Sequence, residues 1–66
     1  REANDALGKA DFVHKLRISR REAKESIHWL EIIKEANETF AEEIDKCVNE
    51  AVELRNILSS IISRIL

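Results

Sequence analysis

The chain has 66 residues and a formal net charge of −2, with one glycine and no proline. Chains this short bury only about 60% of their unfolded surface, so a stable fold normally needs a disulfide, a metal ion or association with another chain. The single cysteine excludes an internal disulfide and no cluster of metal ligands is evident, which leaves association as the expected stabiliser of one all-α domain.

The first part of the chain is expected to hold the end of one helix and the whole of another. Residues 1–7 are interpreted as the last turns of a truncated helix, because Gly8 can supply the left-handed conformation that ends helices. Residues 9–36 then form a long helix, in which alanine, leucine, isoleucine, lysine and glutamate dominate. Asn37 is the expected stop of this helix.

The last helix is expected over residues 40–66. Thr39 and Glu42 form a T-x-x-E pattern, which is typical of a capping box at a helix start. Only a few residues then connect the two long helices, and so short a connection makes them antiparallel. The predicted fold is therefore an antiparallel long-helix hairpin that forms part of an oligomeric helical bundle.

Each long helix carries an apolar seam whose steps alternate between three and four residues, the spacing of bundle packing. The seam of the earlier helix comprises Phe12, Leu16, Ser19, Ala23, Ser26 or Ile27, Leu30 and Ile33. The seam of the last helix comprises Ile44, Cys47, Ala51, Leu54, Leu58, Ile61 and Ile65. The middle of the earlier seam is small, so a neighbouring backbone could approach closely there.

The apolar surface exceeds what a two-helix hairpin can cover, because a second stripe exists on each helix. The stripes are Ile18, Trp29, Ile32 and Ala36, and Val48, Val52, Ile62 and Leu66. Missing N-terminal helices of the bundle could cover the surplus, it could be a subunit interface, or both could hold. The expected helix or subunit contacts are Phe12, Leu16, Ile18, Trp29, Ile32, Leu54, Leu58 and Ile62.

Charge is distributed unevenly along the chain. Residues 9–24 contain six basic and two acidic side chains, a local excess of +4. Residues 31–53 contain two basic and eight acidic side chains, a local balance of −6. Opposite charges on the two segments favour their lying side by side, though only weakly where they are exposed.

A basic row is the candidate nucleic-acid contact. It consists of Arg17, Arg20, Arg21 and Lys24, followed by His28. Their spacing places them on one helix face, where such a row can follow the phosphates of RNA or DNA. The alternative is a solvated face, because Glu31 and Glu35 continue it with opposite charge and no aromatic residue interleaves the row to stack on bases. Both interpretations stay open.

The sequence suggests no catalytic, metal or cofactor site. His14 and His28 lie about four helical turns apart, too far to share a metal ion. Cys47 lies within the predicted seam, where a cysteine is normally a small buried hydrophobe, and no general base is suggested nearby. We therefore expect a non-enzymatic protein without a small-molecule substrate.

Arg55 interrupts the apolar arc of the last helix. Its aliphatic stem could be buried while its guanidinium reaches water. Alternatively, it could form an ion pair at an interface, with Glu22 or Glu25 as the partner. The sequence does not distinguish between these two glutamates.

The expected location is the cytoplasm. No signal peptide is visible, and no apolar run approaches the roughly 20 residues that a membrane span requires. An unpaired cysteine is typical of a reducing compartment.

The run from Lys9 to Leu30 resembles the bacterial four helix bundle protein family, also called the 23S rRNA intervening-sequence proteins. Members carry a similar K-x-D-F-hydrophobic-H-K-L-x-I-A-x-K/R-E-A-x-E-x-x-Y-W-L run. The matching positions are Lys9, Asp11, Phe12, His14, Leu16, Ile18, Glu22, Ala23, Glu25, Trp29 and Leu30. Ser19 and His28 depart from the alanine and tyrosine that are common there, and the chain has about half the length of a family member.

The resemblance implies that the hairpin forms part of an up-and-down four-helix bundle. It also implies that such four-helix subunits form homopentamers without an established catalytic activity. The main functional expectation is therefore a self-associating bundle protein of bacteria. A related branch, the accessory (variability determinant) proteins of diversity-generating retroelements, binds nucleic acid and partners a reverse transcriptase. This alternative would use the basic row, although the acidic balance of the whole chain argues against it.

Overall fold

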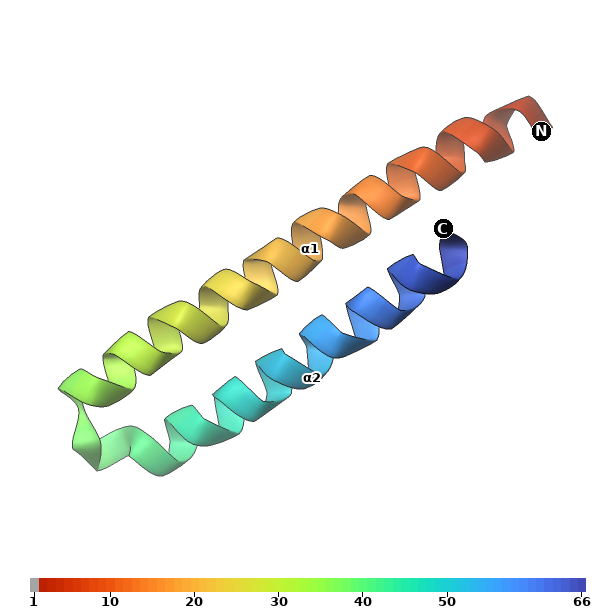
Figure 1. The fold of residues 1–66 in the computed structure, drawn as a ribbon. Helices are drawn as coiled ribbons and strands as arrows, with labels where there is room; N and C mark the ends of the chain where they lie inside the picture. The colour runs from red at the N-terminus through yellow and green to blue at the C-terminus, as the bar shows by residue number, and fades with distance from the viewer. Residues whose placement is uncertain (1) are drawn as a thin grey trace.

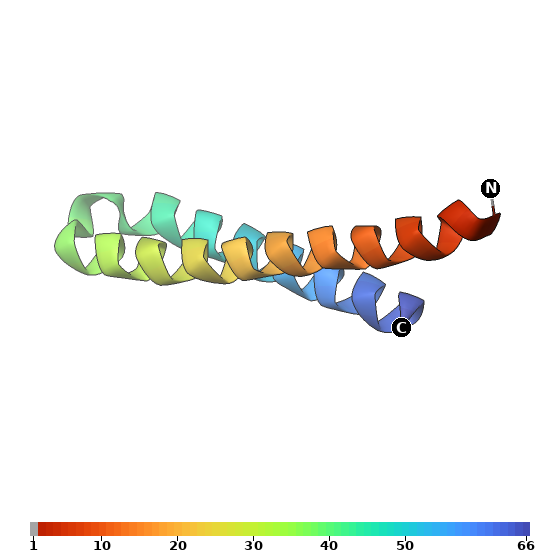
Figure 2. The same cartoon turned by 90° about the horizontal axis from the view of Figure 1, so that it is seen from above.

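The structure is a computed structural model that describes the backbone of residues 2–66 and the side chains of residues 8–66. Helix α1 (Glu2–Ala36) and helix α2 (Ala41–Ile65) are joined by the short 3₁₀ helix η1 (Glu38–Phe40). The two long helices lie side by side and antiparallel (Figure 1), in a rod of 53 × 15 × 14 Å. They cross at a shallow angle when seen from above (Figure 2). The predicted all-α class and helical hairpin are thus confirmed.

The predicted helix break at Gly8 is wrong, because α1 continues through this residue without interruption. Gly8 does not adopt a positive φ, and a Cβ built on it would meet no atom within 4 Å. Continuing a helix adds one hydrogen bond per residue, and this outweighs the roughly 1 kcal/mol by which glycine is poorer than alanine in a helix interior. Residues 2–7 therefore belong to the same helix as residues 9–36, and Arg1 lies outside the described residues.

Asn37 ends α1 as predicted, but the expected capping box of the last helix does not form. The Asn37 backbone N–H donates to the Lys34 carbonyl at 3.2 Å, and its side-chain Nδ2 donates to the Ile33 carbonyl at 3.2 Å. The chain then turns tightly through η1, so that Phe40 takes the N-cap position of α2 without a side-chain cap hydrogen bond. This turn moves the start of the helix past Thr39.

The contact between the helices follows a seam that differs from the predicted one. It is made of every buried residue and most half-buried residues, at steps that alternate strictly between three and four. On α1 it comprises Val13, Leu16, Arg20, Ala23, Ile27, Leu30 and Lys34. On α2 it comprises Ala41, Ile44, Val48, Ala51, Arg55, Leu58, Ile62 and Ile65. We call these residues the inner seam.

The predicted seams are therefore rotated relative to the observed contact, and six of their fourteen positions lie outside the inner seam. Phe12 and Ile33 of α1, and Cys47 and Leu54 of α2, are exposed. The sequence prediction favoured them because an apolar residue stands at each of these positions. The actual contact instead accepts Arg20, whose long aliphatic stem can cover apolar surface while its charged end reaches the edge.

Two hydrogen-bonded pairs fix the register of the hairpin. Lys34 Nζ lies 2.7 Å from Asp45 Oδ1, and Arg20 Nη1 donates to Ser59 Oγ at 3.2 Å. Between the two pairs, the residue number decreases on α1 by as much as it increases on α2, as expected for two regular helices packed antiparallel. Val13 and Leu66 continue this register at the open end, where they line one groove.

Candidate interaction surface

The hairpin buries little of its apolar surface. Only five side chains of the described residues are buried, and eight large hydrophobic ones are exposed. The exposed ones are Phe12, Trp29, Ile32, Ile33, Phe40, Leu54, Ile57 and Leu66. Monomers rarely expose contiguous apolar patches of more than a few hundred Å², and larger patches mark interaction sites. The arrangement of these residues therefore decides what surface the hairpin offers.

Most of the exposed hydrophobic residues follow heptad positions directly beside the inner seam. With Val13 and Ala41 as heptad position a, position g precedes each a residue and borders the seam. Position g is occupied by Phe12, Ser19, Ser26 and Ile33 on α1, and by Phe40, Cys47, Leu54 and Ile61 at and along α2. Position c, next to g, adds Trp29 on α1 and Ile57 on α2. We call these ten residues the apolar face.

The two halves of the apolar face lie on the same side of the hairpin. Antiparallel pairing places the g positions of both helices on one side of the seam and the e positions on the other. The observed contacts agree, because Asp45 and Ser59, both at position e, form the two cross-helix hydrogen bonds. Arg17 and Leu66, also at position e, line the same groove at the open end. The g positions therefore share the opposite side.

Along α1, position g of the apolar face has large side chains at its ends and small ones between them. Trp29 is 59% exposed and Leu54 is 49% exposed. On α1, Ser19 and Ser26 separate Phe12 from Ile33, and on α2, Cys47 is exposed. Small residues between large ones let a second helix approach closely, so the shape of this surface suits the packing of another helix.

The basic row lies on the other side of the hairpin. Arg17 and Lys24 are at position e, Arg21 is at position b, and all three are exposed. Arg20 is half-buried and donates its hydrogen bond to Ser59 at the edge of the seam. Among the described residues, none of these four basic side chains forms a salt bridge. We call these four residues the basic face.

The part of α2 beside the basic face carries no acidic side chain. Positions e and b there are occupied by Asn49, Val52, Asn56, Ser59 and Ser63. Glu53 lies at position f, on the far side of α2. The positive charge of the basic face is therefore not neutralised across the hairpin.

The residues expected to make helix or subunit contacts divide into three groups. Leu58 and Ile62 are buried in the inner seam, and Leu16 is half-buried there. Phe12, Trp29 and Leu54 lie on the apolar face.

The remaining two expected contacts, Ile18 and Ile32, are at position f on the back of α1. Position f lies well around α1 from position g, so a pair of helices that covers the apolar face does not also cover Ile18 and Ile32. The hairpin thus leaves a broad apolar face and two separate isoleucines on the back of α1.

The sequence prediction missed Phe40 and Ile57 as members of one surface. The expected last helix begins at residue 40, but neither Phe40 nor Ile57 belongs to a predicted seam or stripe. Phe40, Cys47, Leu54 and Ile61 repeat at a seven-residue spacing in a single heptad position, and Ile57 borders this row at position c. That spacing becomes informative only after the inner seam assigns the heptad.

Lys34 and Asp45 form the strongest polar link between the helices. The hydrogen bond and the charge of the Asp45 carboxylate raise the pKa of Lys34 above its ordinary value. The Lys34 side chain is 38% exposed and that of Asp45 is 53% exposed, so water screens the attraction. This pair fixes register near the turn and contributes modestly to stability.

Arg55 lies in the inner seam and is half-buried. Its Nη2 donates to Asn56 Oδ1 at 3.3 Å, and in the described part of the chain it forms no salt bridge with Glu22 or Glu25. The buried stem with an outward guanidinium is the alternative that agrees with this position.

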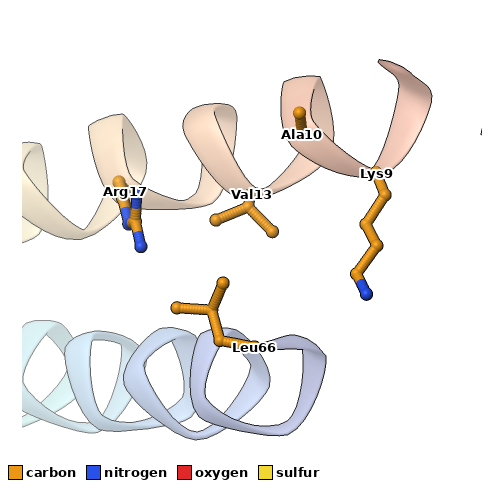
Figure 3. Close-up of a pocket in the computed structure, with 5 residues that line it drawn as sticks. All are labelled: Lys9, Ala10, Val13, Arg17 and Leu66. Carbon is orange, nitrogen blue, oxygen red and sulfur yellow. The ribbon is translucent and has the colours of Figure 1, made fainter. Parts of the chain in front are cut away.

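The hairpin has a small groove at its open end. Lys9, Ala10, Val13 and Arg17 of α1 line it together with Leu66, whose side chain points toward Val13 (Figure 3). Lys9 and Arg17 are both exposed, and none of the described polar side chains is buried. Residues 8–66 also contain no group of three or more side chains that could hold a metal ion.

Comparisons with protein-family models, with curated proteins and with solved structures found no match to this chain. Within the described residues, neither helix combines the length and apolar character needed to cross a membrane.

Proposed function

We propose that this protein is a non-enzymatic helical-bundle subunit that acts by self-association through its apolar face. The single observation that carries this proposal is the alignment of the exposed hydrophobic residues in one heptad position on both helices. Burying apolar surface contributes about 25 cal/mol per Å², so covering the large exposed side chains of this face adds stabilisation that the five buried residues of the hairpin do not supply.

The resemblance of residues 9–30 to the 23S rRNA intervening-sequence proteins supports the same function. It adds the finer expectations of a four-helix bundle and of a homopentamer. Both follow from the resemblance alone, and the mass of the assembled particle distinguishes this pentamer from a bundle of two chains.

The proposal is tested by the mass and stability of the chain over a range of concentrations. Analytical ultracentrifugation should give a mass above the 7.6 kDa of one chain, and the melting temperature should rise with concentration. The emission of Trp29, the sole tryptophan, should shift to shorter wavelength as the oligomer forms, because this side chain is exposed in the single hairpin. A helical monomer at all concentrations would contradict the proposal.

Leu54→Glu should weaken association because it places a charge in the apolar face, which costs several kcal/mol if desolvated. Glu53→Gln is the matched control, since Glu53 is exposed on the back of α2. The control should associate like the unchanged chain. Equal association of both variants would remove the apolar face as the interface.

The basic face, which no acidic side chain of α2 neutralises across the hairpin, supports a second candidate function, the binding of RNA or DNA phosphates. Arg17, Arg21 and Lys24 are exposed within about two helical turns. Each phosphate contact that such residues make releases counterions and adds salt-dependent affinity. This function is compatible with self-association, because the basic face lies on the other side of the hairpin.

Fluorescence anisotropy with a labelled RNA or DNA duplex at ~50 mM salt tests this candidate. Binding should weaken steeply as salt rises, and Arg17→Gln, Arg21→Gln and Lys24→Gln together should abolish it. Lys46→Gln on the back of α2 is the control, since it removes a charge outside the basic face. Absence of binding at low salt, or equal binding by all variants, would refute this second function.

A further inference from the structure

We propose that the occupant of the apolar face is the same face of a second copy of this chain, bound head to tail so that the two turns lie at opposite ends. This inference rests on the proposed self-association and specifies its geometry. Two hairpins related in this way form a four-helix bundle, with α1 on α1 and α2 on α2.

The size of the face matches what a stable pair of chains needs. The rod is 53 Å long and 15 Å wide. Covering most of one side of this rod removes an area close to the roughly 800 Å² per partner that standard interfaces bury. A second hairpin has the same length and width, so it covers the face without leaving a large exposed remainder.

The distribution of charge favours the head-to-tail orientation. The turn end of the hairpin is acidic, since Glu31, Glu35, Glu38, Glu42, Glu43 and Asp45 surround it. The open end and the adjoining half of α1 are basic, with Lys9, Lys15, Arg17, Arg20, Arg21 and Arg64. With the turns together, the two acidic ends would lie at the same end of the pair, whereas the reversed orientation brings each acidic end to a basic one. Of these residues, Lys15, Glu43 and Arg64 border the apolar face at position c and therefore come nearest to the second copy.

The two-fold axis of such a pair is fixed by the register of the hairpin. The pairs Arg20–Ser59 and Lys34–Asp45 set the register of α1 against α2 along the helix axes. In this register, the midpoint between Ser19 and Ser26 on α1 lies at the same height as Ile57 on α2. An axis through this level packs Ser19 on Ser26 of the second copy and Phe12 on its Ile33. The close approach of the two α1 helices is then possible at the serines.

The rim residues at position c distinguish the two orientations most clearly. Head to tail, Ile57 packs on Ile57 of the second copy, and Arg64 lies beside its Glu50. Lys15 then lies over its Trp29, where an ammonium group is attracted by the face of the ring. Among rim residues, Glu22 alone meets a like charge, its own counterpart near the axis.

With the turns together, α1 would instead pack on α2 of the second copy at equal height. Lys15 would then meet Arg64, and the exposed ring of Trp29 would meet Glu50. Ile57 would face Glu22. This orientation pairs the rim hydrophobic residues with carboxylates and repeats the Lys15–Arg64 repulsion on both sides of the axis, so the pattern of the rim favours the head-to-tail pair.

A spin-label distance measurement tests the orientation. Glu38→Cys in a Cys47→Ser background places one nitroxide at the exposed turn. Head to tail, the two labels should be separated by roughly 50 Å at 1.5 Å per residue. With the turns together, they should be within about 25 Å, since neighbouring helices pack 8–10 Å apart. The short distance would overturn the orientation and leave self-association standing, whereas a monomer without any dipolar coupling would overturn both.

A disulfide cross-link provides a second test that does not depend on the label. Ile57→Cys in the Cys47→Ser background should give a covalent dimer on mild oxidation, because the proposed axis passes beside this residue. Glu53→Cys on the back of α2 is the matched control and should remain a monomer on a denaturing gel. Circular dichroism should show full helicity of both variants. An oligomer of unchanged mass in which Ile57→Cys fails to cross-link would contradict the proposed axis.

Discussion

Arg20 donates a hydrogen bond to Ser59 across the middle of the hairpin, with 3.2 Å between Nη1 and Oγ. The stem of Arg20 occupies a position in the inner seam, and its guanidinium reaches the basic face. This arginine therefore links the packing of the two helices to the charged surface beside them. The link predicts a measurable contribution of Ser59 to stability.

Ser59→Ala should lower the free energy of unfolding by about 0.5–1.5 kcal/mol, because it removes a partly buried hydrogen bond and leaves Arg20 without this acceptor. Urea denaturation followed by circular dichroism measures the change. Ser60→Ala is the matched control, since Ser60 is exposed on the back of α2. Ser60→Ala should leave stability unchanged or slightly raised, and equal effects of the two substitutions would contradict the importance of the pair.

Leu58 and Leu54 should respond differently to truncation. Leu58 is 8% exposed in the inner seam, so Leu58→Ala should lower the free energy of unfolding by about 2–4 kcal/mol at any protein concentration. Leu54→Ala should instead weaken association, with a loss of stability that depends on concentration. Denaturation at low and high concentration separates the two effects. Identical, concentration-independent losses would show that Leu54 packs within the hairpin.

Gly8→Ala should stabilise the protein by about 0.5–1 kcal/mol, because α1 is regular at this residue and alanine loses less backbone entropy than glycine in a helix. The open space around Gly8 accommodates the added methyl group. Ala10→Gly, two residues further along the exposed helix, should have the reverse effect. A loss of helicity in Gly8→Ala would instead indicate a left-handed glycine, as the sequence alone had predicted.

The Lys34–Asp45 pair should contribute stability that disappears at alkaline pH. The pKa of Lys34 is raised in the folded protein, first by its hydrogen bond to Asp45 and then by the carboxylate charge. A raised pKa stabilises the fold fully below the unfolded value of 10.5, and this contribution is lost as pH rises through the folded value.

Melting curves from about pH 8 to about pH 12 measure this dependence around the ordinary lysine pKa. In Asp45→Asn, the melting temperature should fall less steeply at alkaline pH, because the contribution of the Lys34–Asp45 pair is absent. Lys46→Gln, beside Asp45 in sequence but on the back of α2, should keep the original dependence. A steeper decrease in Asp45→Asn would contradict the assigned sign.

The sequence by itself determined the class of structure and its main division. The lack of proline, the dominance of helix-forming residues and Asn37 were sufficient to predict two long antiparallel helices, since these features act locally on the backbone. The sequence also indicated an excess of apolar surface and one basic row, because composition and spacing along a helix do not depend on the partner.

Tertiary structure alone decided which positions of each helix face the other. Both helices are apolar over a wide arc, so several rotations bury similar areas, and sequence periodicity could not choose between Phe12 and Val13, or between Cys47 and Val48. In the structure, each helix is rotated about its own axis so that Lys34 pairs with Asp45 and Arg20 with Ser59 along one edge of the contact. With this rotation, the remaining hydrophobic residues lie together on the other side of the hairpin. The reason is that the g positions of two antiparallel helices lie on one side of their contact and the e positions on the other.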